Sequence, residues 1–373
     1  MTHKSWLGRF GNSIGGAIVG LILFIASFVL LYWNEGRAVD AIIALDAASK
    51  QIVSVSAETV DPAHEGRLVH LSGMVDVASD LVDPVFHVTA TDAVRLERRV
   101  EMFQWRENKE TRTEKKLGGG ETETTTYNYV KEWSDKTINS NSFEKQQGHA
   151  NPDMPYQGKV LNVKSARIGG FILDQSQIAQ MSNFEPLAVD AQDGDLPRGF
   201  RWEGEYLYRG KSPDQPQIGD LRIAFHQVPV QTISVIAQQR GSTLAGFKGE
   251  RERIINMVSL GALGADAMIE QAKADEAILT WILRVAGFFM MLFGLTLMAS
   301  PLAWLASLLP FLESLVNAAS FGVAFMIAAP LTLTIIAAAW LIHRPLIGAA
   351  LLAVGLATAF IIKRLILPAR AKG

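Results

Sequence analysis

The sequence predicts a membrane protein with four transmembrane α-helices, one N-terminal and three C-terminal, and a large extracytoplasmic or luminal α+β, strand-rich domain between them. Three observations predict this fold class. The long apolar segments lie near the two ends of the chain, basic residues flank these segments, and the middle of the chain contains short β-branched runs separated by turn residues.

The first apolar segment, residues 14–33, contains no charged side chain. At a rise of about 1.5 Å per residue it covers about 30 Å, the thickness of a hydrocarbon core. A cleaved signal peptide is the alternative, because Lys4 and Arg9 precede the segment. The segment is longer than a usual signal-peptide core and runs directly into Trp33 and the residues after it without a small-residue cleavage site, which favours a retained helix. Apolar spacing beyond it predicts that the helix continues to about Ile52.

Three more uncharged stretches, residues 285–312, 314–342 and 345–362, predict three C-terminal spans, interrupted only by Glu313 and the pair His343-Arg344. The resulting plan has a cytoplasmic N-terminus (1–13), a first span (14–33), the outer domain (34–280), a second span (281–303), a cytoplasmic loop (304–318), a third span (319–342), a fourth span (345–363) and a cytoplasmic tail (364–373).

Basic residues beside the spans predict the orientation. Lys363, Arg364, Arg370 and Lys372 follow the last span, and such clusters remain in the cytoplasm. Four spans return the chain to its starting side, so the N-terminus is expected in the cytoplasm and the middle domain in the periplasm or an organelle lumen. Arg344 falls on the outer side, where a long side chain can reach the interface.

The middle domain is expected to consist mostly of strands. Residues 94–105 and 124–133 are predicted to pair, joined by an exposed connection over 107–116 that ends in three glycines. Further strands are predicted at 159–166, 201–209, 220–227 and 232–239, with a short helix at 173–181. After Gly249, an apolar-rich helical stretch is expected through 254–269, continuing to the second span.

Small residues gather on one face of the first span and are candidates for close helix packing: Ser13, Gly16, Ala17 and Gly20. Gly11/Gly15 and Gly16/Gly20 form two G-x-x-x-G pairs, which let a second helix approach closely. The partner is either a C-terminal helix of the same chain or a second copy, and packing within the chain is favoured.

The sequence offers no catalytic, cofactor or metal motif, and we expect no enzyme activity. The chain has no cysteine, and its seven histidines lack the spacing of a helical zinc site. No Gly-x-Ser-x-Gly motif is present, and the three consecutive glycines indicate a turn because no P-loop sequence follows them. The candidate ligand or partner region is Trp133, His149 and Asn151, although a histidine that bonds a loop backbone is the favoured interpretation of His149.

Several runs resemble the LUMA family, also called transmembrane protein 43. They include Trp33-Asn34-Glu35-Gly36-Arg37, Leu71-Ser72-Gly73, Asp83-Pro84-Val85-Phe86, Val100-Glu101-Met102-Phe103-Gln104-Trp105, Tyr127-Asn128-Tyr129, Glu132-Trp133, Ile138-Asn139-Ser140 and Gly148-His149-Ala150-Asn151-Pro152. The resemblance covers nearly the whole chain and is specific in the first 155 residues. The absence of cysteine and the compact termini favour a bacterial member.

The resemblance implies a four-span protein that self-associates and organises membrane protein complexes. In animal relatives it implies the endoplasmic reticulum and inner nuclear membrane, with emerin and lamins as partners; in a bacterium it implies the inner membrane with a periplasmic domain. We therefore expect a non-enzymatic scaffold whose partners are the lipid bilayer, further copies and other membrane proteins, and no nucleic acid. The alternative is an envelope enzyme or transport accessory whose outer domain binds lipid or another small ligand.

Overall fold

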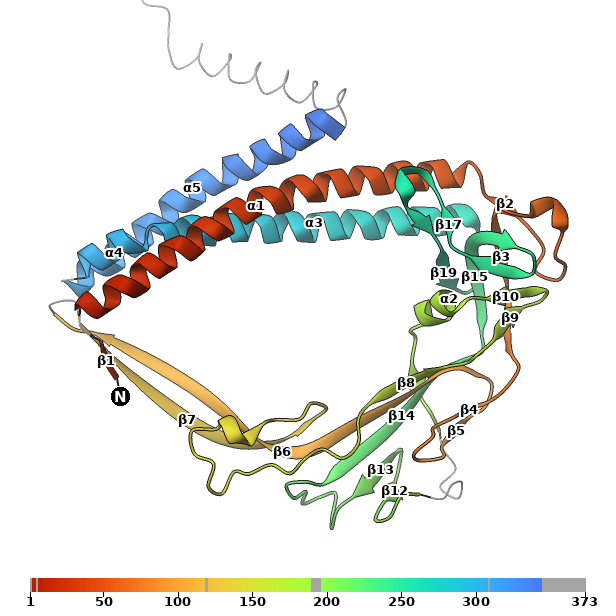
Figure 1. Cartoon of the computed structure of the whole chain (residues 1–373), viewed down its shortest axis with the longest axis horizontal. Coiled ribbons are helices and arrows are strands. Elements are labelled where there is room, and N and C mark those ends of the chain that lie inside the picture. The colour runs from red at the N-terminus through yellow and green to blue at the C-terminus, as the bar shows by residue number, and fades with distance from the viewer. Residues whose placement is uncertain (1, 5, 118–119, 189–195, 308, 344–373) are drawn as a thin grey trace, which may run out of the picture. The chain divides into compact units, whose positions relative to one another are not determined.

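A computed structural model describes residues 2–4, 6–117, 120–188, 196–307 and 309–343 (Figure 1). The chain divides into two compact units. The helical unit comprises Met1–Ala44, Thr111–Thr125 and Ala272–Gly373, and the strand-rich unit comprises Leu45–Glu110 and Thr126–Gln271.

Long apolar helices dominate the helical unit. The helices are α1 (Trp6–Ser49), α3 (Ala265–Met298), α4 (Ser300–Ala306) and α5 (Pro310–His343). Among the described residues, three segments are long and apolar enough to cross a membrane, namely Phe10–Ser49, Ala265–Ala306 and Phe311–His343. One N-terminal and two C-terminal membrane helices are therefore confirmed, as is the continuation of the first helix beyond the apolar segment. The predicted fourth span lies outside the described residues.

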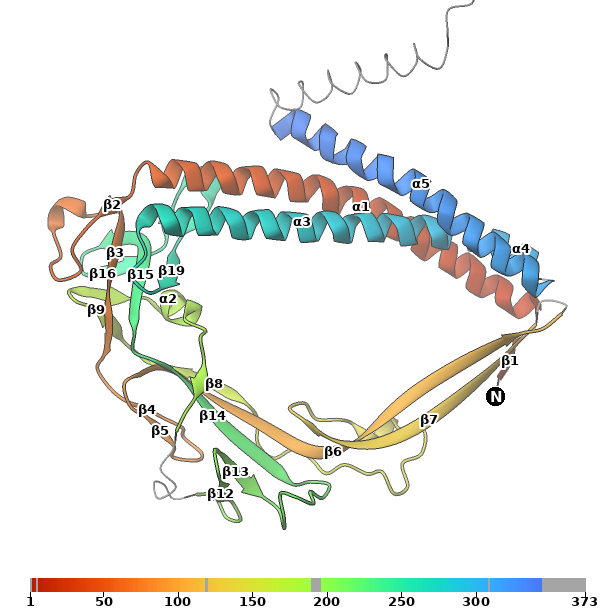
Figure 2. The same cartoon turned by 180° about the vertical axis from the view of Figure 1, so that it is seen from behind.

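Helices α1 and α3 run antiparallel, side by side, as both views show (Figures 1 and 2). Gly20 lies against Gly294, and Leu31 packs on Gly287. The buried apolar core of this helix pair also includes residues of α5: it consists of Leu31, Met291, Leu292, Ala324 and Ala328. Near its N-terminus the chain forms β1 (Thr2–Lys4), which pairs antiparallel with the first residues of β7 (Glu121–Ser134), placing Thr2 opposite Glu123.

One sheet of the strand-rich unit is built on a long hairpin. Its strands are β6 (Ala93–Lys115), β7 (Glu121–Ser134), β8 (Lys159–Asn162), β11 (Glu185–Pro186), β12 (Arg201–Glu203), β13 (Tyr206–Arg209) and β14 (Leu221–Pro229). They lie in the order β7-β6-β14-β13-β12, with β8 paired to β6 and β11 to β14. The predicted pairing of the two runs around residues 94–105 and 124–133 is thus confirmed.

A second group of strands closes into a barrel. The pairing runs from β15 to β3, β9, β10 and β16 and back to β15, so these five strands form a closed circuit. The strands of the circuit are β3 (Leu68–Val77), β9 (Ala166–Ile168), β10 (Phe171–Leu173), β15 (Thr232–Arg240) and β16 (Thr243–Ala245). Two further strands pair with it from outside: β2 (Val53–Ser54) with β3, and β19 (Met257–Leu260) with β15. Within this circuit both edges of each strand are partly occupied, which limits pairing with other chains.

The remaining elements are short. They are the strand pairs β4 (Leu81–Val82) with β5 (Thr89–Ala90) and β17 (Phe247–Lys248) with β18 (Ile254–Ile255), the helix α2 (Gln175–Gln180), and 3₁₀ turns at Pro62–His64, Ser140–Ser142 and Glu250–Glu252. Helix α2 confirms the predicted helix at 173–181. Asp174 begins it with a capping box, because its side chain accepts from the Gln177 backbone and Gln177 bonds back.

The core of the strand-rich unit is filled by side chains that alternate along the strands. On β14, Leu221, Ile223 and Phe225 are buried, with only partly buried residues between them. Phe86 is fully buried and its ring packs against Phe225 at 6.1 Å between centroids. A 31-residue cluster of buried apolar side chains results, which is enough to hold this unit together without disulfides.

Four predicted segments differ from the structure. The stretches 159–166 and 201–209 were each expected to be one strand, but each is divided between two, β8 and β9 in the first and β12 and β13 in the second. Residues 107–116 were expected to be a loop, but β6 extends through them to Lys115. The stretch 254–269 was expected to be helical, but 254–255 and 257–260 are strands and the helix begins only at Ala265. Short apolar runs fit either element, and here β19 gains its hydrogen bonds from the edge of β15.

Candidate functional site

The four helix-packing candidates lie on α1, and the structure places three of them near the chain's own α3 and α4. The backbone of Gly20 is buried against α3, where an added Cβ would lie 2.6 Å from the Gly294 carbonyl oxygen. An added Cβ at Gly16 would lie 3.2 Å from the Ser300 hydroxyl oxygen, and Ser13 accepts a hydrogen bond from this hydroxyl at its carbonyl (2.8 Å).

The other small residues of α1 differ among themselves. Ala17 is partly buried, whereas added Cβ atoms at Gly11 and Gly15 would meet nothing within 4 Å. The close approach therefore depends on Gly20 and, across the interface, on Gly294, where an added Cβ would lie 2.8 Å from the Gly20 carbonyl oxygen. Small residues on both helices let the two backbones come this close.

At the other end of the same helix pair lies a buried ionic cluster. Glu35 on α1 is 1 % exposed, and Arg284 on α3 donates to both of its carboxylate oxygens, at 2.6 and 2.8 Å. The indole of Trp340 on α5 donates to the same carboxylate at 2.6 Å. One buried acid thus joins three helices, and its negative charge is compensated by a bidentate arginine.

A second ion pair lies two residues further along α1 and eight residues earlier on α3. Arg37 pairs with Glu276, and the side-chain amide of Asn34 donates to the Thr280 carbonyl at 3.1 Å. The Thr280 hydroxyl in turn donates to the Glu276 carbonyl at 2.7 Å. The Arg37–Glu276 and Asn34–Thr280 contacts join α1 to α3, so together with the Glu35–Arg284 pair they fix the register of the two helices.

Two cavities adjoin this cluster. One of about 590 Å³ is lined by α3 and α5, and one of about 160 Å³ is lined by α1, α3 and Trp340. Trp281, Arg284 and Trp340 line both cavities. The Arg284 guanidinium lies 4.9 Å from the Trp281 ring centroid and 5.7 Å from that of Trp340, within the range of cation–π attraction.

In the strand-rich unit the structure brings His149 and Asn151 together at Trp105. The His149 ring stacks on Tyr129, with centroids 3.8 Å apart, and its edge-on contact with Trp105 measures 4.7 Å. Its Nδ1 lies 3.1 Å from the Lys145 carbonyl oxygen. This geometry holds a loop against the hairpin, which is the structural role favoured for His149 from the sequence.

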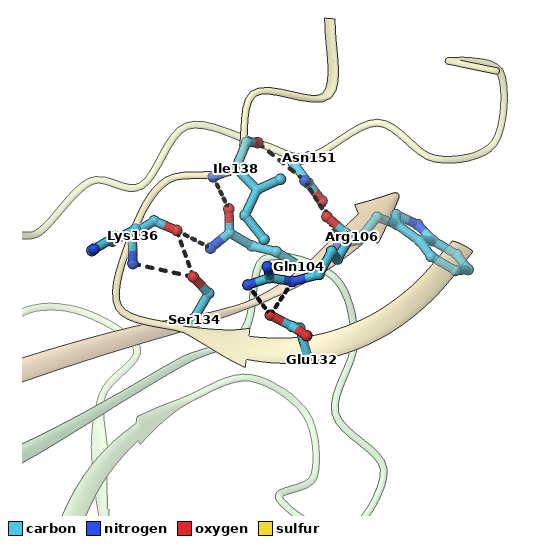
Figure 3. A network of polar contacts seen from close by, with 8 residues as sticks. Gln104, Arg106, Glu132, Ser134, Lys136, Ile138 and Asn151 are labelled. Carbon is cyan, nitrogen blue, oxygen red and sulfur yellow. Dashed lines mark hydrogen bonds and ion pairs between the residues drawn. The ribbon is translucent and has the colours of Figure 1, made fainter. Parts of the chain in front are cut away.

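Asn151 and Gln104 attach the same loop to β6 (Figure 3). Asn151 accepts from the Trp105 backbone N–H at 2.7 Å and donates to the Trp105 and Ile138 carbonyls. Gln104 is fully buried, donates to the Lys136 carbonyl and accepts from the Ile138 N–H. All of these amide contacts go to backbone, as expected of a structural link.

Trp133 belongs to a neighbouring cluster. Its ring lies 5.3 Å from that of Phe103 and 6.3 Å from that of Tyr208, and the Arg222 guanidinium lies 4.6 Å above it. Burial and the adjacent Asp220 carboxylate raise the pKa of the Tyr208 hydroxyl, which donates to that carboxylate at 2.6 Å. No ring contact joins Trp133 to His149 within the described residues, so the three predicted residues occupy two separate packed clusters.

No cluster of three or more histidine or acidic side chains that could hold a metal ion occurs among the described residues. The ionic cluster of the helical unit was not predicted from the sequence. Its signal is nonetheless present: Glu35 and Arg37 follow the first apolar segment, Glu276 and Arg284 precede the second, and opposite charges at two span ends favour pairing between antiparallel helices.

The apolar helices and their buried ion pair define an integral membrane protein in which a helical anchor is joined to a strand-rich unit. Comparison with known proteins then identifies the family: the family model for transmembrane protein 43 matches residues 102–345, and the chain belongs to this family. It is 34 % identical to human transmembrane protein 43 over 368 residues, covering 95 % of this chain and 91 % of the relative.

Two further animal relatives have similar identities to this chain. The chain is 33 % identical to rat transmembrane protein 43, and the match covers 94 % of this chain and 90 % of the relative. It is also 33 % identical to the Drosophila melanogaster homologue, where the match covers 91 % of this chain and 92 % of the relative. No solved structure matches the chain. Family membership therefore extends over nearly the full chain.

Proposed function

We propose that this protein is a non-enzymatic, multi-pass membrane scaffold that self-associates and organises membrane protein complexes. Membership of the transmembrane protein 43 family over nearly the full chain is the observation that carries the proposal. The helical unit supports it, because the Gly20–Gly294 contact and the Glu35–Arg284 pair bind α1 and α3 into a fixed anchor. In the strand-rich unit the buried apolar residues form one large cluster, which leaves its outer surface for recognition.

The proposed orientation places the N-terminus and residues 364–373 in the cytoplasm and the strand-rich unit in the periplasm or lumen. Basic residues beside the spans support this orientation, with residues 345–363 as the fourth span. A bacterial member would occupy the inner membrane, and an animal member the endoplasmic reticulum and inner nuclear membrane.

The proposed partners are the bilayer, further copies of the chain and other membrane proteins; emerin and lamins apply only to an animal member, and nucleic acid is not a partner. One face of α1 supports contact with lipid or a second copy. Its exposed apolar side chains recur at helical spacing: Ile18, Ile22, Ile25 and Val29 are 56 %, 60 %, 56 % and 65 % exposed.

Native mass spectrometry of the full chain, extracted in a mild detergent, tests the scaffold proposal. We expect a discrete assembly of more than one copy, with other membrane proteins retained in substoichiometric amounts. Ile22→Ser together with Ile25→Ser should weaken the assembly, whereas Ile254→Ser, an exposed apolar residue of the strand-rich unit, serves as the control. A protein that is monomeric at every concentration and retains no other protein would contradict the proposal.

A separate measurement addresses enzyme and metal chemistry. Elemental analysis of the purified chain, compared with His149→Ala and His87→Ala, should find no stoichiometric metal in any of the three. Stoichiometric metal that is lost in either variant would change the assignment from scaffold to metalloprotein.

A further inference from the structure

The two cavities of the helical unit differ in chemistry. The larger, about 590 Å³, lies between α3 and α5, and apart from Arg284 its walls are mainly apolar, with Phe288, Leu333 and Ile336 among them. The smaller, about 160 Å³, is lined by the acidic Glu35 and Glu276. Because the two cavities share Trp281, Arg284 and Trp340, an arginine between two indoles lies where an apolar compartment meets a polar one.

The positions of the tryptophans along the helices place Arg284 at the level of the lipid headgroups. Trp33 and Trp281 are 55 % and 63 % exposed, and Trp340 lies beside the same ion pair. On α1, 23 residues separate Trp33 from Phe10, and the same number separates Trp281 from Trp304. That separation corresponds to about 35 Å of helix. The rings of Phe10 and Trp304 lie 4.6 Å apart at the opposite end, so two aromatic belts are spaced as the two interfaces of a bilayer.

The four charged side chains at and beside the smaller cavity have no net charge. Glu35 and Glu276 carry two negative charges, and Arg284 and Arg37 carry two positive charges. A ligand with a net charge would leave one charge uncompensated in a partly buried site, which is costly. A ligand with one negative and one positive group adds no net charge, so the site favours a zwitterion over an anion.

We propose that the two adjacent cavities together bind one zwitterionic phospholipid. An acyl chain occupies the apolar compartment between α3 and α5, and the phosphate lies at Arg284, whose planar guanidinium is suited to phosphate oxygens and whose side chain is 15 % exposed. The ammonium group of the headgroup enters the smaller cavity, where the carboxylates of Glu35 and Glu276 and the face of Trp281 favour a cation.

This lipid site goes beyond the scaffold proposal and can fail independently of it. The test uses the full chain in detergent, stripped of lipid and then mixed with phosphatidylethanolamine, phosphatidylglycerol or diacylglycerol of identical acyl chains. Native mass spectrometry should detect one retained phosphatidylethanolamine per chain, at least fivefold more than either other lipid. Equal retention of diacylglycerol would show that the phosphate is not recognised and would overturn the proposal, as would stronger retention of phosphatidylglycerol.

Two variants fill the apolar compartment without touching the ion pairs. Ala329→Trp and Ala337→Trp each add an indole to the cavity wall, and each should reduce lipid retention at least tenfold. Met326→Trp is the matched control, because this residue is on the same helix, is 66 % exposed and does not line the cavity; it should retain lipid within twofold of the unmodified chain. Unchanged retention in both filling variants would overturn the proposal.

A third measurement needs no substitution. Phosphatidylethanolamine brominated on its acyl chain should quench tryptophan fluorescence in saturable fashion at about one lipid per chain, because Trp281 and Trp340 line the cavity. Quenching that rises linearly with lipid and never saturates would indicate only general lipid contact. Cross-linking of Ala337→Cys to residues 345–362 or to a second copy in native membranes would assign the groove to protein instead, and either result would overturn the proposal.

Discussion

Arg284 of α3 contacts both carboxylate oxygens of Glu35 on α1, although 249 residues separate them in sequence. The pair is almost completely buried, with side-chain exposures of 15 % and 1 %. Breaking such a pair leaves a buried charge without a partner, whereas replacing both members by apolar groups removes the desolvation cost as well.

Glu35→Gln should destabilise the helical unit by about 3 kcal/mol, because Arg284 then remains buried and charged. The double variant Glu35→Gln with Arg284→Met should recover most of this loss. Thermal unfolding in detergent, followed by size-exclusion chromatography, measures both. Glu132→Gln, which removes one partner of the exposed Arg106–Glu132 pair, is the control and should cost no more than about 1 kcal/mol. Equal losses of stability in Glu35→Gln and Glu132→Gln would contradict the role assigned to the buried Glu35–Arg284 pair.

Gly20→Ala should lower the melting temperature far more than Gly15→Ala. The added methyl group at Gly20 meets the backbone of α3, where Gly294 and Met298 cannot move without shifting the helix, whereas the same group at Gly15 meets nothing within 4 Å. Gly16→Leu and Gly20→Leu should separate the helices further, and Val19→Leu, on an exposed position, should be mild. Equal melting temperatures for all these variants would show that the small residues are incidental to packing.

Reporter fusions test the orientation. A reporter that is active only outside the cytoplasm should be active when inserted within residues 107–120 and inactive at the C-terminus, because the basic residues after residue 362 are expected inside. The β1–β7 pairing opposes this orientation, because a bilayer around residues 14–33 would separate Thr2 from Glu123. If the orientation holds, cysteines introduced at these two positions should not cross-link in intact membranes, and a cross-link would contradict the orientation.

Asn151→Ala should destabilise the strand-rich unit by about 2 kcal/mol, because it removes the hydrogen bonds to both the N–H and the carbonyl of Trp105. His149→Ala, which removes ring contacts and one hydrogen bond to the same loop, provides the comparison. Increased protease cleavage between residues 135 and 150 in Asn151→Ala would locate the effect in the loop, and unchanged cleavage would contradict the proposed attachment.

His226 should make the stability of the strand-rich unit dependent on pH. Burial, and secondarily the charge of Arg99, lower the pKa of the His226 imidazole, so the folded state favours the neutral form. The unfolded chain binds the proton more readily, and the contribution of His226 to stability should therefore be lost as pH falls below about 6.5. His226→Gln should flatten the melting temperature between pH 7.5 and 5.5. An unchanged slope would rule out this assignment.

The sequence predicts the membrane helices well because their signal is local: an uncharged run such as residues 14–33 identifies a span without reference to any other part of the chain. The Glu35–Arg284 pair depends on the antiparallel alignment of two helices, which no short-range pattern specifies. Strand β6 was missed beyond Trp105 because charged residues have low strand propensity, and here it is stabilised across the hairpin by contacts such as the hydrogen bond between Arg106 and Glu132.

In the strand-rich unit, too, the turn around His149 could be predicted from local sequence, but its contacts with distant residues could not. The turn containing His149 was recognised from sequence because glycine and proline mark it, and the structure places Gly148 at a φ of 82°. Its attachment to Trp105 through Asn151 depends on a contact across 46 residues. Separate clusters for His149 and Trp133 likewise follow from how the loop folds back on the hairpin.

Because Glu35 and Arg284 lie far apart in sequence, Glu35 is synthesised well before the arginine that pairs with it. Ribosomes add about 5–20 residues per second, so α3 leaves the ribosome about 10–50 s after Glu35. Throughout this interval α1 is in the membrane while its acidic side chain lacks the arginine that later neutralises it. Either the carboxylate stays hydrated at the bilayer surface, or an insertion factor shields it until the second helix arrives. The delay between the two halves of this ion pair is therefore a physical reason for this chain to need assistance during membrane insertion.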